Sequence, residues 1–242
     1  VVPHRSLHYV PFCALHDGHH SLVDRHELSL TPSATLWLAG RRARGAAAAA
    51  PPRSVVAVGV GGEALPHVAE EVQAVAQAFA TSAGGRSTLL LETQATHAAL
   101  CAALPGADVL HMACHGQFRA DSPYFSALHL GDGPLTVRDA ASLPLKAQLV
   151  TLSACETGVS RIAPGDELLG LLRGFLLAGA PRVLATQWTV DDASTSQLMA
   201  HFYRAVVAGA RPAAALRQAQ QALAQQQPHP YHWAPFTLHE RG

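Results

Sequence analysis

From residue 54 onward, short apolar runs alternate with segments that have the spacing of amphipathic helices. The run SVVAVGV at Ser54–Val60 is continuous and β-branched, which is typical of a strand buried on both faces. The segment Val68–Ala80 instead repeats apolar residues every three or four positions, which predicts a helix with one buried side. The chain therefore begins this region with a strand followed by a helix.

The same alternation continues to the carboxyl end. It predicts further strands at Ser87–Leu91, Ala107–Ala113, Gln148–Ser153, Arg182–Gln187 and Trp233–Leu238, a hairpin of Ala127–Leu130 and Pro134–Val137, and helices at Thr96–Leu104, Asp166–Ala178, Ser194–Val207 and Pro212–Gln226. Strands that alternate with helices form a doubly wound, mainly parallel α/β sheet with helices on both faces. Such sheets carry their functional residues at the carboxyl ends of the strands.

The first 53 residues have a different pattern. Residues 1–38 alternate short apolar runs with turn residues, which predicts short strands or hairpins, and we assign 1–40 to the amino-terminal part of the same domain. Residues 41–53 are rich in alanine and end in Pro-Pro, so we expect a linker loop before an α/β core at 54–242. Because the chain opens at Val1 without a methionine, we expect a fragment of a longer protein.

Composition excludes several classes of protein. The 242 residues include 17 basic and 17 acidic side chains, and this balance argues against binding to nucleic acid or an anionic membrane surface through overall charge. No apolar run reaches the ~18 residues of a membrane helix, and no signal peptide opens the chain. Four cysteines without a CxxC pair favour a reducing, cytoplasmic setting. A single lysine and abundant alanine suggest a GC-rich bacterial genome.

Two predicted strands end in residues that can carry chemistry. The third runs into Cys114-His115-Gly116, and the fourth runs into Ala154-Cys155-Glu156. In a sheet of order 2-1-3-4-5 these strands are neighbours ~4.8 Å apart, so His115 and Cys155 would face each other across one cleft. A thiol beside an imidazole can act as a nucleophile, and backbone amides near Gly116 and at Cys155 could hold an oxyanion. The alternative is a buried structural cysteine beside an ordinary histidine.

Six segments of the chain resemble the CHAT family, the caspase-like peptidase domains associated with tetratricopeptide repeats. They are VVPHRSLHYVPFCAL (1–15), TPSATL (31–36), ADVLHMACHGQF (107–118), LVTLSACETG (149–158), GDELLGLLRGFLLAGAPRVLATQW (165–188) and HPYHWAPFTL (229–238). The resemblance implies a caspase-like fold and a cysteine endopeptidase with His115 as catalytic histidine and Cys155 as nucleophile. It implies no metal and no cofactor. It also implies a protein or peptide substrate, a regulatory repeat or sensor region in the full-length protein, and a setting such as antiphage defence with a gasdermin substrate.

Other residues have two interpretations each. Trp188 follows the fifth strand, where a caspase-like enzyme forms its first specificity pocket, and it is either a pocket wall or a tryptophan packed at the sheet edge. Asp166, Glu167 and Asp191 lie near helix starts, where they either form an acidic pocket for a basic side chain or stabilise the helix dipole.

The sequence also bears on a metal site and on a second function. His111, Cys114 and His115 have metal-like spacing, but strand alternation sends Cys114 to the face opposite the histidines, so we expect no zinc site. The domain could instead be a catalytically idle caspase-like interaction module, or a hydrolase or transferase of small esters or thioesters. The reactivity of Cys155 distinguishes a catalytic thiol from a structural one.

Overall fold

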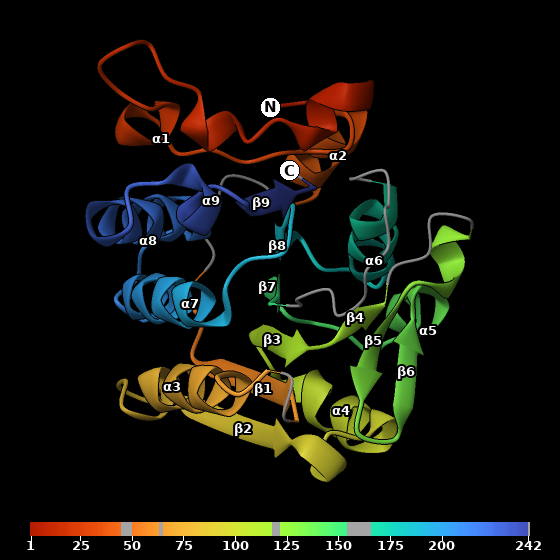
Figure 1. Cartoon of the computed structure of the whole chain (residues 1–242). Coiled ribbons are helices and arrows are strands. Elements are labelled where there is room, and N and C mark those ends of the chain that lie inside the picture. Colours follow the sequence, from red (N-terminus) through yellow and green to blue (C-terminus); the bar gives the residue numbers. More distant parts are fainter. Residues whose placement is uncertain (45–49, 63–64, 118–121, 154–165, 242) are drawn as a thin grey trace.

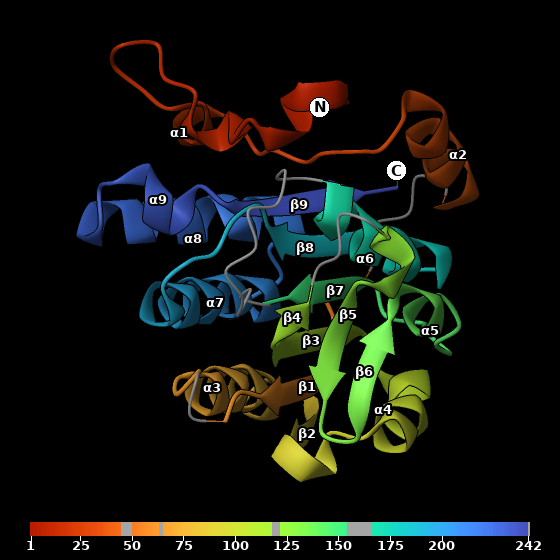
Figure 2. The same ribbon diagram turned by 45° about the vertical axis from the view of Figure 1, so that its right-hand side comes forward.

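A six-stranded sheet forms the centre of the molecule. The computed structural model describes residues 1–44, 50–62, 65–117, 122–153 and 166–241. The central strands, in spatial order, are β2 (Arg86–Leu91), β1 (Ser54–Val60), β3 (Val109–Cys114), β7 (Leu149–Leu152), β8 (Arg182–Thr186) and β9 (Phe236–Glu240). All neighbouring pairs are parallel except β8 and β9 (Figure 2). The predicted order, with the third and fourth strands adjacent, is confirmed.

Helices cover both faces of this sheet, as the alternation of strands and helices predicts. One face carries α3 (Val68–Ala80), α7 (Asp192–Val207) and α8 (Pro212–Gln226), and the other carries α4 (His97–Ala103), α5 (Val137–Ala141) and α6 (Asp166–Leu177) (Figures 1 and 2). Each face has its own hydrophobic cluster. Alternate residues of β3 contribute to the two clusters, since Val109 and Ala113 join the first and Leu110 and Met112 join the second.

A small antiparallel sheet extends the edge at which β3 ends. It consists of β4 (Gly116–Gln117), β5 (Ala127–Leu130) and β6 (Gly133–Thr136) (Figure 1). The predicted hairpin is β5 and β6, which pair from Ala127↔Thr136 to Leu130↔Gly133. Gly133 has φ of 138°, a conformation that disfavours any residue with a Cβ. Because β4 follows β3 after one residue and pairs with β5, it joins the end of β3 to this hairpin.

The prediction of short strands in residues 1–38 is wrong. The structure has two 3₁₀ turns at Arg5–Tyr9 and Phe12–Ala14, and helices α1 (Leu22–Arg25) and α2 (Ala34–Arg44). A capping box between Ser21 and Asp24 starts α1, and it was visible in the sequence. α2 also extends into the predicted linker, because ATLWLAGRRAR consists mostly of strong helix formers.

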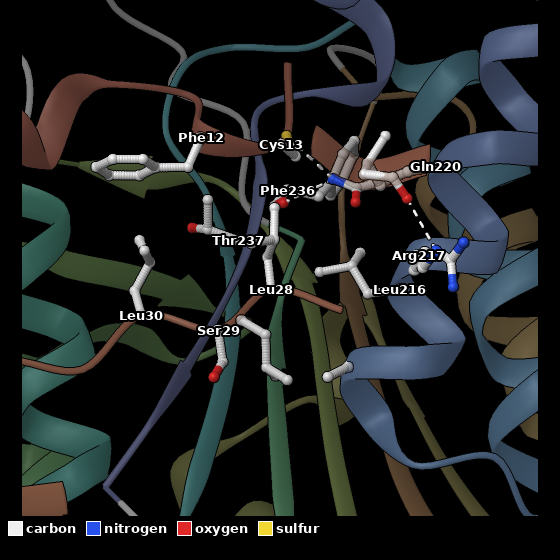
Figure 3. A pocket seen from close by; sticks show the side chains of 13 residues that line it. Phe12, Cys13, Leu28, Ser29, Leu30, Leu216, Arg217, Gln220, Phe236 and Thr237 are labelled. Carbon is white, nitrogen blue, oxygen red and sulfur yellow. Dashed lines mark hydrogen bonds between the residues drawn. The ribbon is translucent and has the colours of Figure 1, made fainter. Parts of the chain in front are cut away.

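The amino-terminal segment packs across α8 and the outer strand β9 instead of forming its own sheet. Leu30 donates its amide to Leu238 O at 2.8 Å and accepts from the Glu240 amide at 2.8 Å. Beneath it lies an apolar cavity lined by Phe12, Cys13 and Leu28 of the amino-terminal segment, by Leu216 of α8 and by Phe236 of β9 (Figure 3). Its volume of about 20 Å³ fits one or two waters and no organic ligand.

The carboxyl end departs from prediction by a short helix. The predicted strand Trp233–Leu238 begins later, as β9 at Phe236, after α9 (Pro230–Trp233). Pro230 occupies the first helical position, and the His229 side chain accepts a hydrogen bond from the Tyr231 amide, so this turn is capped locally. Within the described residues, no helix is both long and apolar enough to cross a membrane.

Candidate functional site

His115 lies at the carboxyl end of β3, as predicted. Its backbone carbonyl accepts a hydrogen bond from the His129 amide at 2.9 Å, and the next residue, Gly116, pairs with Leu128 of β5. The backbone at His115 is therefore fixed by β3 on one side and by the β4–β5 ladder on the other.

The imidazole of His115 is oriented by a backbone carbonyl. Its Nε2 lies 3.1 Å from Gly61 O, at the end of β1. Because a carbonyl oxygen can only accept, Nε2 must carry the hydrogen in this contact. In a neutral ring, Nδ1 is then the nitrogen that accepts a proton, which is the role that a general base needs.

The Gly61-Gly62 turn that supplies this carbonyl requires both glycines. A Cβ at Gly61 would lie 2.5 Å from the Leu65 carbonyl oxygen, and Gly62 has φ of +53°. The amides of both glycines donate to Oε1 of Glu92, at 3.1 and 3.3 Å. Neither Gly61 nor Glu92 was predicted to be part of the site, although both follow strand ends.

The end of β7 lies beside β3. Met112 pairs with Leu152, and the Ser153 amide donates to Met112 O at 2.8 Å. Cys155 follows two residues after Ser153 in the sequence but lies outside the described residues, as does Glu156. The Cys155–His115 dyad and the oxyanion site at Gly116 and Cys155 thus stay predictions.

Two of the three cysteines in the described part of the chain, Cys13 and Cys114, differ from a catalytic nucleophile. Cys114 lies in the hydrophobic cluster on the α4–α6 face, and burial raises its pKa to about 12. Burial likewise raises the pKa of Cys13 to about 11. Neither thiol forms much thiolate near neutral pH, so neither competes as a nucleophile.

His111 belongs to a buried polar network. Its Nε2 lies 3.0 Å from Oε1 of Glu71, without hydrogen-bond alignment, and its Nδ1 lies 3.2 Å from the Tyr203 hydroxyl. That hydroxyl donates to Thr151 Oγ1 at 2.7 Å. As strand alternation predicts, Cys114 packs in the cluster on the other face of the sheet. The network joins α3, β3, α7 and β7 directly below the strand ends.

Trp188 lies in the loop after β8, partly buried against the cluster on the α7–α8 face. Its Nε1 donates to the Tyr231 carbonyl at 3.1 Å, and the Tyr231 hydroxyl donates to Thr189 O at 2.9 Å. The indole is therefore packed against the α9 turn, which agrees with the sheet-edge interpretation. Its role as a pocket wall stays a prediction.

Of the three acidic candidates, the structure describes the side chain of Asp191 alone. Asp191 is the N-cap of α7, since its Oδ2 accepts from the Ser194 amide at 2.9 Å and hydroxyl at 2.7 Å. These hydrogen bonds hold the pKa of Asp191 below its usual value. Asp166 and Glu167 are the first residues of α6, but their side chains are not among those that the structure describes. For Asp191 the capping interpretation has direct support, and the acidic-pocket role of all three stays a prediction.

Two solved structures share this architecture. The Saccharomyces cerevisiae separase–securin complex superposes with a TM-score of 0.66 over 97% of this chain and 15% of the separase-complex chain, at 14% identity. The Arg specific cysteine proteinase gingipain R superposes with a TM-score of 0.55 over 77% of this chain and 45% of its own, at 11% identity. These likenesses establish a caspase-like α/β fold.

Sequence comparison adds relatives and a family. Tetratricopeptide repeat protein 28 of mouse is 35% identical over 106 residues, and the human protein is 33% identical over 106 residues. Each match covers 43% of this chain and 4% of the relative, so this chain corresponds to a small part of those proteins. The model of the CHAT domain matches residues 1–240. The chain therefore belongs to the CHAT domain family.

Proposed function

We propose that this domain is a cysteine endopeptidase in which Cys155 is the nucleophile and His115 the general acid and base. The observation that carries the proposal is the orientation of His115. Its imidazole sits at the carboxyl end of β3 with Nε2 held on the Gly61 carbonyl, beside the strand whose continuation contains Cys155. A dyad needs a thiol within reach of an oriented imidazole.

The chemistry that follows is acyl transfer. The Cys155 thiolate attacks the scissile carbonyl carbon, and the oxyanion forms hydrogen bonds with backbone amides at Cys155 and near Gly116. The protonated imidazole of His115 then gives its proton to the leaving amine as the C–N bond breaks. Water hydrolyses the thioester, with His115 now accepting the water's proton and returning it to the sulfur. Neither the acylation of Cys155 nor the hydrolysis of the thioester changes an oxidation state.

We further propose that a repeat region regulates the domain. Both curated relatives are named for tetratricopeptide repeats, which supports a setting next to such repeats. The substrate on this proposal is one partner protein recognised as an extended peptide, as in a defence enzyme that cleaves a gasdermin. A bacterial cytoplasm fits the composition, with its single lysine and four cysteines without a CxxC pair.

The test is a cleavage profile on a mixed peptide library with three proteins: the wild type, Cys155→Ala and His115→Ala. We expect cleavage by the wild type that is lost in both variants. The rate of alkylation by iodoacetamide is measured in parallel at neutral pH. The idle interaction module would be supported if the wild type cleaved no peptide and if the wild type and Cys155→Ala were alkylated equally slowly. Cleavage of small esters without cleavage of peptides would support a non-proteolytic hydrolase.

A further inference from the structure

Three consecutive strand ends meet in one chain of hydrogen bonds. β2 ends at Leu91 and is followed by Glu92, β1 is followed by Gly61-Gly62, and β3 is followed by His115. Glu92 Oε1 accepts from the Gly61 amide at 3.1 Å and the Gly62 amide at 3.3 Å, while Gly61 O contacts His115 Nε2 at 3.1 Å. The carboxylate and the imidazole thus lie on opposite sides of the same turn.

The turn connects the two side chains through a single peptide group. The carbonyl of Gly61 and the amide N–H of Gly62 belong to the same planar peptide unit. A carboxylate that accepts from the N–H polarises the peptide and pushes electron density onto the carbonyl oxygen, so the oxygen becomes a better acceptor for the imidazole N–H. Hydrogen bonds in such chains strengthen one another. Glu92, although an exposed residue, therefore has the geometry both to fix the orientation of this peptide and to strengthen its bond to His115.

Glu92 is itself held in an uncommon backbone conformation. Its φ is 46°, the left-handed region that a long side chain rarely adopts. The β5–β6 turn packs tightly against it, since a Cβ at Gly131 would lie 2.2 Å from the Glu92 carbonyl oxygen. The Gly131 amide also donates to Ala95 O at 2.9 Å. Such strain persists where the surroundings enforce it, and it is concentrated at functional sites.

We infer that Glu92 is a positioning residue of the His115 site, acting through the Gly61–Gly62 peptide in the way that a carboxylate acts directly on histidine in a catalytic triad. The inference rests on the proposed function for its catalytic consequence. The orientation of His115, however, is a property of the folded domain and can be measured without any substrate.

A merely structural role for Glu92 makes a different prediction. If the carboxylate only stabilised the Gly61-Gly62 turn, its loss would lower thermal stability and leave the state of the imidazole unchanged. If it positions His115, its loss changes the Nε2–H contact and lowers kcat, whereas KM changes little, because a residue that acts only through His115 makes no contact with the substrate.

The experiment compares Glu92→Gln, Glu92→Gly and Asp132→Asn with the wild type. Gln keeps an acceptor oxygen but loses the charge, and Gly removes the side chain at a φ that glycine adopts readily. Asp132 is the matched control, since its carboxylate accepts from the His97 amide at 3.0 Å in the same corner of the molecule without touching Gly61 or His115. Thermal unfolding establishes that each variant is folded.

The first measurement is the ¹⁵N spectrum of the histidine rings, with the His115 signals assigned by their loss in His115→Ala. We expect the wild type and Asp132→Asn to show the Nε2–H form of His115, and Glu92→Gly to show a mixture of tautomers. The second is kcat and KM on a peptide whose cleavage depends on Cys155. We expect kcat to fall about 10- to 100-fold in Glu92→Gly, by less in Glu92→Gln, and within twofold of the wild type in Asp132→Asn.

The two measurements separate this inference from the proposed function. An unchanged His115 spectrum in a folded Glu92→Gly protein would overturn the positioning role, whether or not the enzyme is active. An equal loss of kcat in Asp132→Asn would also overturn it, because the loss would then come from disturbing the β5–β6 turn and the Glu92 loop together. A wild type without Cys155-dependent cleavage would refute the peptidase, while the spectra still decide the role of Glu92.

Discussion

The hydroxyl of Tyr203 connects three elements beneath the strand ends, and its removal tests that connection. Tyr203 is fully buried on α7, and its hydroxyl lies 2.7 Å from Thr151 Oγ1 on β7 and 3.2 Å from His111 Nδ1 on β3. Burial raises the pKa of Tyr203, so the hydroxyl remains a donor at any ordinary pH. Tyr203→Phe keeps the ring and its packing but leaves both partners without the hydroxyl.

The expected loss follows from the two contacts. An unsatisfied buried polar group costs about 1–3 kcal/mol, so two such groups lower the free energy of unfolding by about 3 kcal/mol. For a chain of this length each kcal/mol shifts Tm by about 2–4 °C, which predicts a fall of about 6–12 °C. No cavity contributes, because the phenyl ring occupies the same space.

The assay is equilibrium unfolding in urea, followed by tryptophan fluorescence and far-ultraviolet circular dichroism. Tyr231→Phe is the matched control, since Tyr231 is 44% exposed and its hydroxyl donates to Thr189 O at 2.9 Å. Water can replace that bond, so we expect a change within about 0.5 kcal/mol. If Tyr203→Phe were no more destabilising than Tyr231→Phe, the hydroxyl of Tyr203 would contribute nothing to the free energy of unfolding, contrary to this prediction.

Three further predictions concern single positions. Burial lowers the pKa of His239 from 6.5 to about 3, so between those values the unfolded chain binds a proton that the folded chain does not. Stability should therefore fall by about 2 kcal/mol from pH 7 to pH 5, and urea titrations of His239→Leu should show a shallower fall; an equal slope would contradict this origin. Thr96→Ala removes the N-cap that accepts from the Ala99 amide at 3.1 Å, and we expect a loss of about 1 kcal/mol by urea unfolding, against no loss if α4 were stabilised by packing alone. Gly131→Ala would place a Cβ 2.2 Å from Glu92 O, and we expect a loss of about 1–3 kcal/mol. A stable, fully active Gly131→Ala protein would show that this corner relaxes freely.

The sheet was predictable because its signals are local and strong. The β-branched run of β1 and the helical periods of α3 and α8 fix these elements to the residue, and parallel pairing follows from their alternation. The amino-terminal segment was not predictable in the same way. Its apolar residues are buried against α8 and β9, more than 170 residues away along the chain, so no local period records how they pack.

The same distinction between local pattern and long-range packing applies to the candidate site. The position of His115 at a strand end follows from the sequence pattern, and so does its neighbouring strand. The contact of His115 with Gly61, and of Gly61 with Glu92, depends on how far each loop extends beyond its strand. The signal that could have pointed to these residues was that the loop after β1 begins with Gly61-Gly62 and the loop after β2 begins with Glu92. A pattern of strands and helices gives no distances between such loops.

The pairing of Leu30 with β9 has a mechanical consequence. Val1 is held by the Ser29 carbonyl and the Thr31 amide, at 2.8 and 3.0 Å, while Leu30 bonds Leu238 and Glu240. Both ends of the described chain therefore lie against the same short stretch (Figure 1). Tension applied between the two ends would load these hydrogen bonds together with the bond from the Arg241 amide to Pro181 O, at 3.0 Å. β3, which leads to His115, is separated from β9 by β7 and β8, so it takes part in none of these terminal bonds.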